Sequence, residues 1–350
     1  MPRVTVITPN YNHARYLPQR LESILNQTFQ DFELIILDNA STDNSREVIQ
    51  SYTSDPRVRA IFNAENNGST FKQWNLGLSH ANGEYIWFAE SDDYADPTLL
   101  ETLVDRLDRH PNVGLAFCQS WAVDENSNIL YNFVDYFAGS SPSPRWRKDY
   151  INSGPDEAMN YLFWYNTIPN ASAVLLRRGI LERAGGVPDD LLLAGDVMTY
   201  INVLSISDIA FVSDPLNFHR QHPDTVRGRT LKQGIVAREL RVVHSALIKR
   251  YGFRRLLRAE YGFRRLLGGK DEALTMYVQR LIWQAKRPPD NIVPPGEVLA
   301  LLFWFARIQP VALRIALPIL TRQVVADLAR RVGLLGLARK LKNALAKSTH

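Results

Sequence analysis

The fold is decided by residues 3–38, which read RVTVITPNYNHARYLPQRLESILNQTFQDFELIILD. Residues 3–8 have the β-branched run of a strand that ends at Pro9, and residues 32–38 form a second such run. Between them, residues 13–28 carry apolar side chains at helical spacing. The segment therefore predicts a β-α-β unit whose strands are buried in a parallel sheet.

The same alternation continues to residue 90. Helices are expected over residues 41–55 and near 70–81, and strands over 58–63 and 84–90. This order predicts an α/β fold, with a Rossmann-like, mostly parallel sheet flanked by helices. Ligands of such sheets bind beyond the carboxyl ends of the strands. Three polar segments fall at those ends and are expected to converge: TPNYN (8–12), DNASTDNS (38–45) and ESDDY (90–94).

The last of these segments carries three carboxylates in four residues, on Glu90, Asp92 and Asp93. Such groups repel one another unless they are solvated or bind a cation. Mg²⁺ or Mn²⁺ typically takes one or two protein carboxylates together with phosphate oxygens. The alternative is a solvated loop, or the N-cap of the helix that Asp96 and Pro97 open. Its position after a predicted strand favours the metal site.

Two further acids stand where a ligand could meet them. Asp38 closes a predicted strand, so its carboxylate is expected to face the ligand crevice and to accept hydrogen bonds from a nucleobase or a ribose hydroxyl. The residues after it, 41–45, supply mainly turn and capping chemistry. Asp196 follows Gly195 and precedes a helical run. It could deprotonate an acceptor hydroxyl, although the residues alone favour a helix N-cap.

A fourth cluster is FHRQHPDTVRGR, residues 218–229. His222 could bind a metal as neutral imidazole, and Arg220, Arg227 or Arg229 could meet a diphosphate. A single histidine is more often structural, so the residues alone leave both interpretations open.

Charge is distributed unevenly along the chain. Residues 1–250 hold 23 Lys and Arg against 30 Asp and Glu, whereas residues 251–350 hold 18 against 6. The acidic first part argues against nucleic acid as the partner, and salt-sensitive DNA binding by the basic end is the competing hypothesis. Residues 321–347 fit a basic amphipathic helix, which could bind an anionic membrane surface or pack on the preceding domain.

No secretory signal and no membrane span are expected. The apolar run near the N-terminus is short, and the most apolar stretch, residues 298–320, is interrupted by two arginines and two prolines. The single cysteine, Cys118, excludes an internal disulfide and fits a small buried side chain in a reducing compartment. A cytoplasmic location is expected, peripheral on the inner face of the cell membrane if the basic helix binds lipid.

Two long blocks resemble a known family. VTVITPNYNHARYLPQRLESILNQTFQDFELIILDNASTDNS (4–45) and NNGSTFKQWNLGLSHANGEYIWFAESDDY (66–94) are similar to blocks of family 2 glycosyltransferases of the GT-A type, and the likeness covers residues 3–225. It implies inverting transfer of a sugar from a nucleoside-diphosphate sugar to an acceptor hydroxyl, with Mn²⁺ or Mg²⁺ as cofactor. The family's usual roles imply a saccharide or lipid-linked saccharide acceptor, in surface polysaccharide or glycolipid assembly.

The resemblance gives donor-binding roles to individual positions. Thr8, Pro9 and Tyr11 match the segment that lies along the nucleobase, and Asp38 matches the acid that contacts the base.

The resemblance also gives metal-binding and catalytic roles to other positions. Asp92 matches the metal-binding acid that ends the family's Asp-x-Asp motif and also contacts the donor, and Asp93 matches the acid after it. Asp196 matches the general base, in place of a plain cap. His222 matches a late histidine that approaches metal or diphosphate in some members.

Three positions depart from the family pattern. Glu90 stands where the first Asp of the motif is usual, and Asn39-Ala40 replaces the commoner Asp-Gly. Trp74 stands where many members have Arg, so Lys72 or an arginine from residues 220–229 is expected to supply charge to the donor phosphates. Glu90 also supports the alternative function, a non-catalytic or divergent nucleotide-sugar-binding protein of the same fold. A nucleotidyltransferase is a weaker alternative, because TPNYNHARYLP lacks the Gly-rich loop of that class.

The expected organisation is a GT-A type catalytic domain over residues 1–230, followed by a helical, basic region over 231–350. Within the first, residues 1–112 form the nucleotide-sugar-binding half and residues 113–230 the acceptor half. Side chains in the acceptor half that could bind sugars, or simply pack in the core, are Trp164, Tyr165, Asn166 and Asn170.

Overall fold

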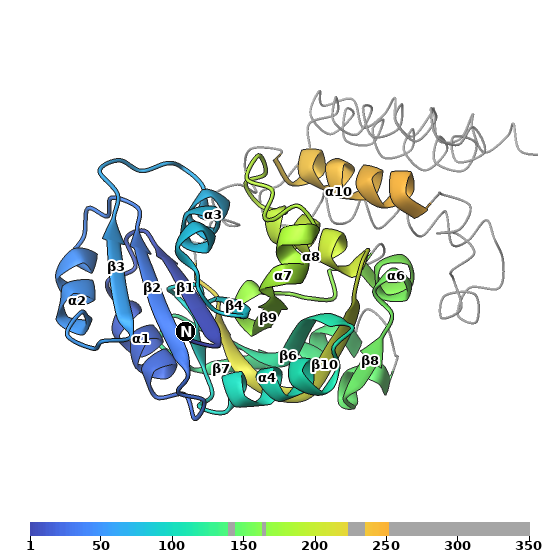
Figure 1. Ribbon diagram of the computed structural model, residues 1–350, viewed down its shortest axis with the longest axis horizontal. Coiled ribbons are helices and arrows are strands. Elements are labelled where there is room, and N and C mark those ends of the chain that lie inside the picture. Colours follow the sequence, from blue (N-terminus) through green and yellow to red (C-terminus); the bar gives the residue numbers. More distant parts are fainter. Residues whose placement is uncertain (139–143, 163–165, 223–234, 252–350) are drawn as a thin grey trace, which may run out of the picture. The chain divides into compact units, whose positions relative to one another are not determined.

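The computed structural model of the chain describes residues 1–138, 144–162, 166–222 and 235–251 (Figure 1). The chain divides into two compact units. The described residues up to 222, together with those from Val243 onward, belong to the first, and residues 235–242 belong to the second. The predicted domain boundary near residue 230 stays a prediction, and the amphipathic segment 321–347 lies outside the described residues.

One sheet contains all the described strands. They are β1 (Val4–Asn10), β2 (Phe32–Asp38), β3 (Val58–Phe62), β4 (Tyr85–Phe88), β5 (Tyr94–Ala95), β6 (Val113–Val123), β7 (Ile129–Asn132), β8 (Tyr150–Asn152), β9 (Val174–Arg177) and β10 (Asp208–Arg220). Their order is β3-β2-β1-β4-β9-β6-β10-β5, with β7 beside β6 and β8 beside β10.

The long strands of this sheet mostly run the same way. β1 is parallel to β2 and β4, β2 is parallel to β3, and β6 is parallel to β10. β9 is antiparallel to both β4 and β6, so those two strands share one direction. The carboxyl ends of β1, β2, β4, β6 and β10 therefore lie at one edge of the sheet. The α/β, mostly parallel prediction is confirmed.

The helices are α1 (Leu17–Leu25), α2 (Ser45–Tyr52), α3 (Thr70–His80), α4 (Leu99–Arg109), α5 (Phe133–Ala138), α6 (Gly154–Glu157), α7 (Arg178–Arg183), α8 (Gly195–Leu204) and α10 (Ile235–Tyr251). Two segments of 3₁₀ helix are η1 (Pro144–Arg147) and η3 (Ala171–Ala173), and η2 (Ala158–Leu162) is a π-helical turn.

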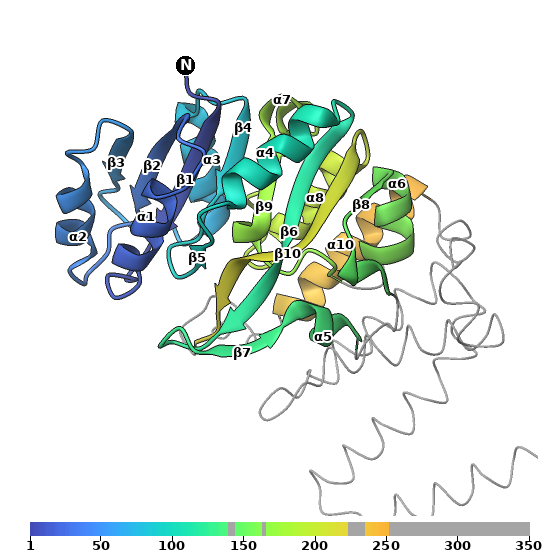
Figure 2. The ribbon, with the colours of Figure 1, turned by 90° about the horizontal axis from the view of Figure 1, so that it is seen from below.

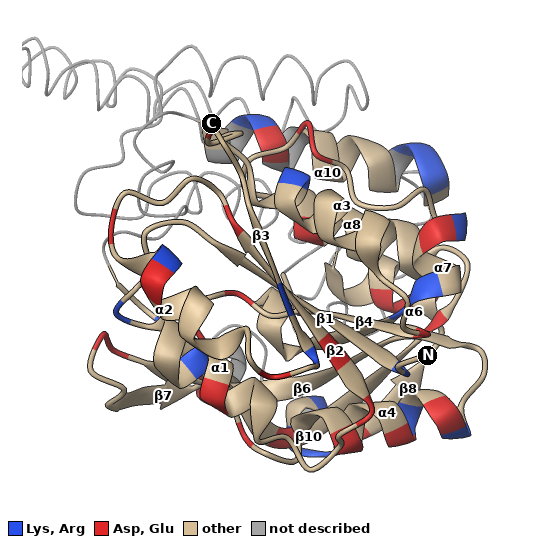
Figure 3. Cartoon of the chain, turned by 60° about the vertical axis from the view of Figure 1, so that its left-hand side comes forward, with Lys and Arg blue, Asp and Glu red and all other residues tan. Residues whose placement is uncertain are grey.

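The helices cover both faces of the sheet. Alternate strand residues point to opposite sides, so Val6 and Trp87 pack with α1, α2 and α4, whereas Ile7 and Ile86 pack with α3, α7 and α8. Figure 2 shows α1 and α4 in front of the sheet and α3 and α8 behind it. Acidic and basic residues both occur along α1, α4 and α7 (Figure 3). Among the described helices, none has the length and apolar character of a membrane span.

One predicted boundary was wrong. The first strand does not end at Pro9 but continues to Asn10, which pairs with Asp38 of β2. Proline is tolerated here because pairing with β4, on the other side, stops at Ile7 and Phe88. The strand therefore carries its polar residues to the edge of the sheet before the chain turns.

Candidate functional site

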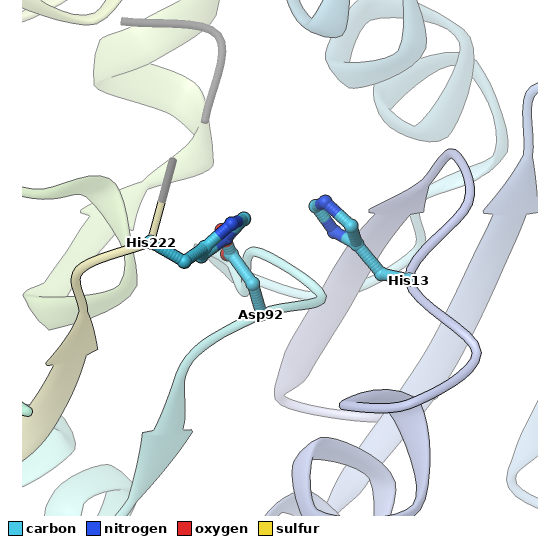
Figure 4. Close-up of side chains that lie close together, drawn as sticks. All are labelled: His13, Asp92 and His222. Atoms are coloured by element: carbon cyan, nitrogen blue, oxygen red, sulfur yellow. The ribbon is translucent and has the colours of Figure 1, made fainter. Parts of the chain in front are cut away.

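Three side chains meet at the carboxyl edge of the sheet. His13 follows β1, Asp92 follows β4 and His222 follows β10. Their potential ligand atoms all lie within 4.8 Å of one another. In Figure 4 the three side chains approach one another from separate segments of the chain. The convergence predicted from the sequence involved residues 8–12, 38–45 and 90–94, and the structure adds His222 from the end of β10 beside Asp92.

Asp92 is held as a carboxylate by its surroundings. Its Oδ2 atom lies 3.0 Å from Nε2 of His222, whose side chain is only 3% exposed. Burial would raise the pKa of Asp92, but the hydrogen bond from His222 and the nearby imidazoles of His13 and His219 hold it well below its ordinary value. An ionised, partly buried carboxylate beside imidazoles is suited to binding a cation.

His13 was missed by the sequence analysis, although it follows the first strand closely enough for the strand-end rule to have found it. Its Nδ1 atom lies 2.8 Å from Oγ of Ser91, and its ring meets that of His222 edge to face at 5.6 Å. Neighbouring bonds fix this loop. Asn12, in the left-handed conformation at φ 58°, accepts the amide of Thr42 at 2.7 Å through Oδ1.

Glu90 faces away from this group. Nε1 of Trp74 donates to its Oε1 at 2.9 Å, and the Trp74 ring stacks on Phe88 with centroids 3.9 Å apart. Oγ of Ser172 accepts the backbone amide of Glu90 at 3.1 Å. Burial raises the pKa of Glu90 to about 8, and the neighbouring carboxylate of Asp92 adds to the shift. Glu90 is thus bound to α3, and its predicted metal role stays a prediction.

Asp93 faces β10. Its Oδ1 atom accepts the backbone amide of Arg220 at 2.8 Å and lies 3.3 Å from Nδ1 of His219. The buried guanidinium of Arg220 donates to the carbonyl oxygens of Asp92 at 2.7 Å and Asp124 at 3.0 Å. Arg220 therefore fixes the acidic loop to the sheet rather than facing a diphosphate, and the metal role of Asp93 also stays a prediction. Arg227 and Arg229 lie outside the described residues.

Arg20 of α1 is buried beneath the same acidic loop. It has no exposed surface, and its guanidinium lies over the ring of Trp87 at 5.0 Å. None of its three guanidinium nitrogens has a hydrogen-bond partner among the described residues. Burial lowers the pKa of Arg20 to about 10, against the opposing influence of Asp93, Glu90 and Asp92. Arg20 is thus a fixed positive charge close to three carboxylates.

The predicted nucleobase side lies along β1 and β2. Asp38 is buried and accepts hydrogen bonds from Nδ2 of Asn10 at 2.9 Å and from the amide and hydroxyl of Ser41. Ala40 between them has φ 60°, a conformation that favours glycine. Thr8 and Pro9 are buried, Tyr11 is partly exposed, and Lys72 is exposed in the first turn of α3. The roles of these residues and of Asp38 in binding the sugar donor stay predictions.

Asp196 lies in the first turn of α8. Ala194 is the N-cap residue, so the interpretation of Asp196 as the cap was wrong. A Cβ atom at Gly195 would come 2.6 Å from the ring of Phe71, so glycine lets α8 begin directly against α3. The carboxylates of Asp196 and Glu90 both raise the pKa of the buried Tyr200, after the larger effect of burial. The approach of Gly195 to Phe71 of α3 and the hydrogen bond between Glu90 and Trp74 of the same helix show that α8 begins beside the helix that holds Glu90.

The predicted acceptor residues are only partly described. Asn170 is buried and donates to Oγ of Ser120 at 3.0 Å, while its Oδ1 accepts from Nδ2 of Asn217 at 2.9 Å. These contacts give Asn170 a packing role. Asn166 is exposed, and Trp164 and Tyr165 lie outside the described residues.

The fold, a mostly parallel sheet with helices on both faces, is that of a GT-A type protein. The family described as "Glycosyl transferase family 2" matches residues 5–183, and the chain belongs to this family. The resemblance seen in the sequence is confirmed.

Two curated relatives show how far the likeness extends. Glycosyltransferase GlyG of Streptococcus pneumoniae is 35% identical over 132 residues, which are 37% of this chain and 43% of GlyG. The putative teichuronic acid biosynthesis glycosyltransferase TuaG of Bacillus subtilis is 39% identical over 93 residues, 26% of this chain and 36% of TuaG. The matched part is less than half the length of each relative.

Two solved structures share the fold. TarS 1–349 of S. aureus in complex with UDP-GlcNAc has a TM-score of 0.59 and 17% identity, covering 95% of this chain and 92% of that one. The mannosyltransferase PcManGT of Pyrobaculum calidifontis, in complex with GDP-Man and Mn²⁺, has a TM-score of 0.51 and 19% identity, covering 100% and 81%. At these identities the likeness concerns the fold.

Proposed function

We propose that the protein is an inverting glycosyltransferase, which moves a sugar from a nucleoside-diphosphate sugar to an acceptor hydroxyl. One observation carries the proposal: Asp92, an ionised carboxylate, lies 3.0 Å from His222 at the edge of the sheet where three parallel strands end. Membership of the family and the donor-bound complexes of similar folds support it.

The residues at this edge fit a divalent cation. Carboxylate oxygen and neutral imidazole nitrogen are both ligands of Mn²⁺, and carboxylate with phosphate oxygens suits Mg²⁺. Asp92 and His222 would hold the ion. A bound divalent ion supplies Lewis-acid stabilisation of the charge that grows on a departing nucleoside diphosphate.

The other residues of the site would bind the nucleotide and deprotonate the acceptor. Asp38 and the segment from Thr8 to Tyr11 would bind the nucleotide, and the exposed Lys72 would meet its phosphates. Asp196 would take the proton of the acceptor hydroxyl as that oxygen attacks the anomeric carbon. Attack from the face opposite the leaving group in a single displacement inverts the anomeric configuration.

The names of related proteins support a class of acceptor. TuaG carries teichuronic acid biosynthesis in its name, and other relatives are named chondroitin synthase. We infer a saccharide or lipid-linked saccharide acceptor in surface polysaccharide or glycolipid assembly. The proposed location is the cytoplasm, peripheral on the inner face of the membrane if the basic segment 321–347 binds lipid.

The decisive experiment incubates the purified chain with Mn²⁺ and a panel of UDP- and GDP-sugars. A cognate donor should raise the melting temperature by mass action and release nucleoside diphosphate when an acceptor is present. Asp92→Asn should abolish both effects, whereas Asp105→Asn, on the outer face of α4, should change neither. Donor binding by the wild type without any nucleoside diphosphate release would instead establish the non-catalytic alternative. A retained anomeric configuration in the product, seen by NMR, would exclude inversion.

A further inference from the structure

The cation site contains a potential ligand to which the family resemblance gave no role. His13 comes from the loop after β1, and its potential ligand atom lies within 4.8 Å of those of Asp92 and His222. We propose that His13 is the third protein ligand of the divalent cation, and that two imidazoles with one carboxylate make this site select Mn²⁺ over Mg²⁺. The inference rests on the proposed function for the presence of a cation.

The spacing of the three groups suits a shared ion. Metal–ligand bonds of about 2.1 Å set adjacent ligands of an octahedral ion about 3 Å apart and opposite ligands about 4.2 Å apart. Oδ2 of Asp92 and Nε2 of His222 are 3.0 Å apart. A cation between them would replace the proton that the two atoms otherwise share, and an atom of His13 within 4.8 Å needs only a small approach to complete one face.

The ring of His13 is already oriented for this role. Its Nδ1 atom lies 2.8 Å from Oγ of Ser91. In the tautomer with the proton on Nδ1, the ring donates to Ser91 and presents Nε2 as the ligand. Bonds of this kind fix both the tautomer and the orientation of metal-binding histidines.

The backbone that carries His13 is also fixed before any cation binds. Oδ2 of Asp43 accepts the amide of Ala14 at 3.0 Å, and Oγ of Ser41 accepts the amide of Asn12 at 2.9 Å. His13 is thus held from both sides by the loop after β2. A preorganised ligand loses little conformational freedom on binding.

The types of ligand atom determine which divalent cation the site prefers. Imidazole nitrogen is a poor ligand for Mg²⁺, which prefers oxygen and keeps much of its water, whereas Mn²⁺ accepts both nitrogen and oxygen. A site with two imidazoles and one carboxylate also carries less negative charge than a pair of carboxylates. Such a site therefore compensates Mg²⁺ poorly for the water molecules that the ion loses on binding.

Pulsed EPR of the wild-type chain with Mn²⁺ tests the ligand set directly, because it detects nitrogen atoms bound to the ion. Two coordinated imidazole nitrogens are expected in the wild type and one in His13→Gln. The Kd for Mn²⁺ should rise about tenfold or more in His13→Gln and about tenfold in Ser91→Ala. His110→Gln, at the C-cap of α4 on the opposite edge of the sheet, is the matched control and should keep the wild-type Kd.

Competition with Mg²⁺ tests the selectivity. A hundredfold excess of Mg²⁺ should leave most of the Mn²⁺ EPR signal of the wild-type complex in place, and should displace Mn²⁺ readily from His13→Gln. A single coordinated nitrogen in the wild type, or unchanged Mn²⁺ binding in His13→Gln, would overturn the proposal. If two nitrogens were bound to Mn²⁺ but the protein transferred no sugar, the ligand assignment would hold and the proposed function would be wrong. The two proposals can therefore be tested separately.

Discussion

The indole N–H of Trp74 donates a hydrogen bond to the carboxyl group of Glu90 at 2.9 Å. The two residues are also two of the three departures from the family pattern, where Arg and Asp are usual. The structure joins them: a tryptophan stacked on Phe88 reaches a side chain one methylene longer than aspartate. The departures from the family pattern at Trp74 and Glu90 are therefore explained by one contact between the two side chains.

This contact predicts coupled effects on stability. Trp74→Phe should lower the free energy of unfolding by about 1 kcal/mol through loss of the hydrogen bond, and the same change should cost less in a Glu90→Met background. Glu90→Gln keeps an acceptor oxygen and should keep most of the coupling. Urea denaturation of the four members of the cycle measures it. Strict additivity of Trp74→Phe and Glu90→Met would show that the contact contributes nothing.

Asp196→Asn should lower kcat for transfer by about 10²–10⁴-fold, because the acceptor hydroxyl loses its base. The melting-temperature rise caused by donor and Mn²⁺ should persist, because donor binding does not use this carboxylate. Asp190→Asn, an exposed acid in the preceding loop, is the control and should transfer normally. Full activity of Asp196→Asn would remove the assignment.

Arg20 should oppose cation binding, because its buried positive charge lies near Asp92. Arg20→Met is expected to tighten Mn²⁺ binding by up to about tenfold, since little screening occurs in the interior. Arg20→Lys retains the charge and should bind Mn²⁺ as the wild type does. Isothermal titration of the three proteins measures the effect, and weaker binding by Arg20→Met would contradict it.

Ala40→Gly should raise the free energy of unfolding by up to about 1 kcal/mol. The left-handed conformation at φ 60° costs a residue with a Cβ atom about 1–2 kcal/mol, and the greater freedom of glycine in the unfolded chain offsets part of that gain. Ala64→Gly, in a loop position without positive φ, should instead lower stability. The two substitutions moving in the same direction in urea denaturation would contradict the argument.

Much of the fold was predictable because its signals are local. Helical spacing in residues 13–28 and the β-rich run in 32–38 each report on a few neighbouring residues. The insertion of β9 antiparallel between β4 and β6 was not predicted, because strand pairing across the middle of the chain leaves no local pattern.

The order of strands and helices along the chain is enough to place Asp38 and Asp92 at strand ends, and parallel strands bring such ends to one edge of the sheet. The partner of each acid at that edge became known from the structure. Asp92 faces His222, 130 positions further along the chain, while Glu90 turns to α3 and Asp93 to β10. These choices depend on side-chain direction and on distant partners. They follow only from the packing of the whole molecule, which is why the structure was needed to place His13 beside Asp92 and Arg20 close to the three carboxylates.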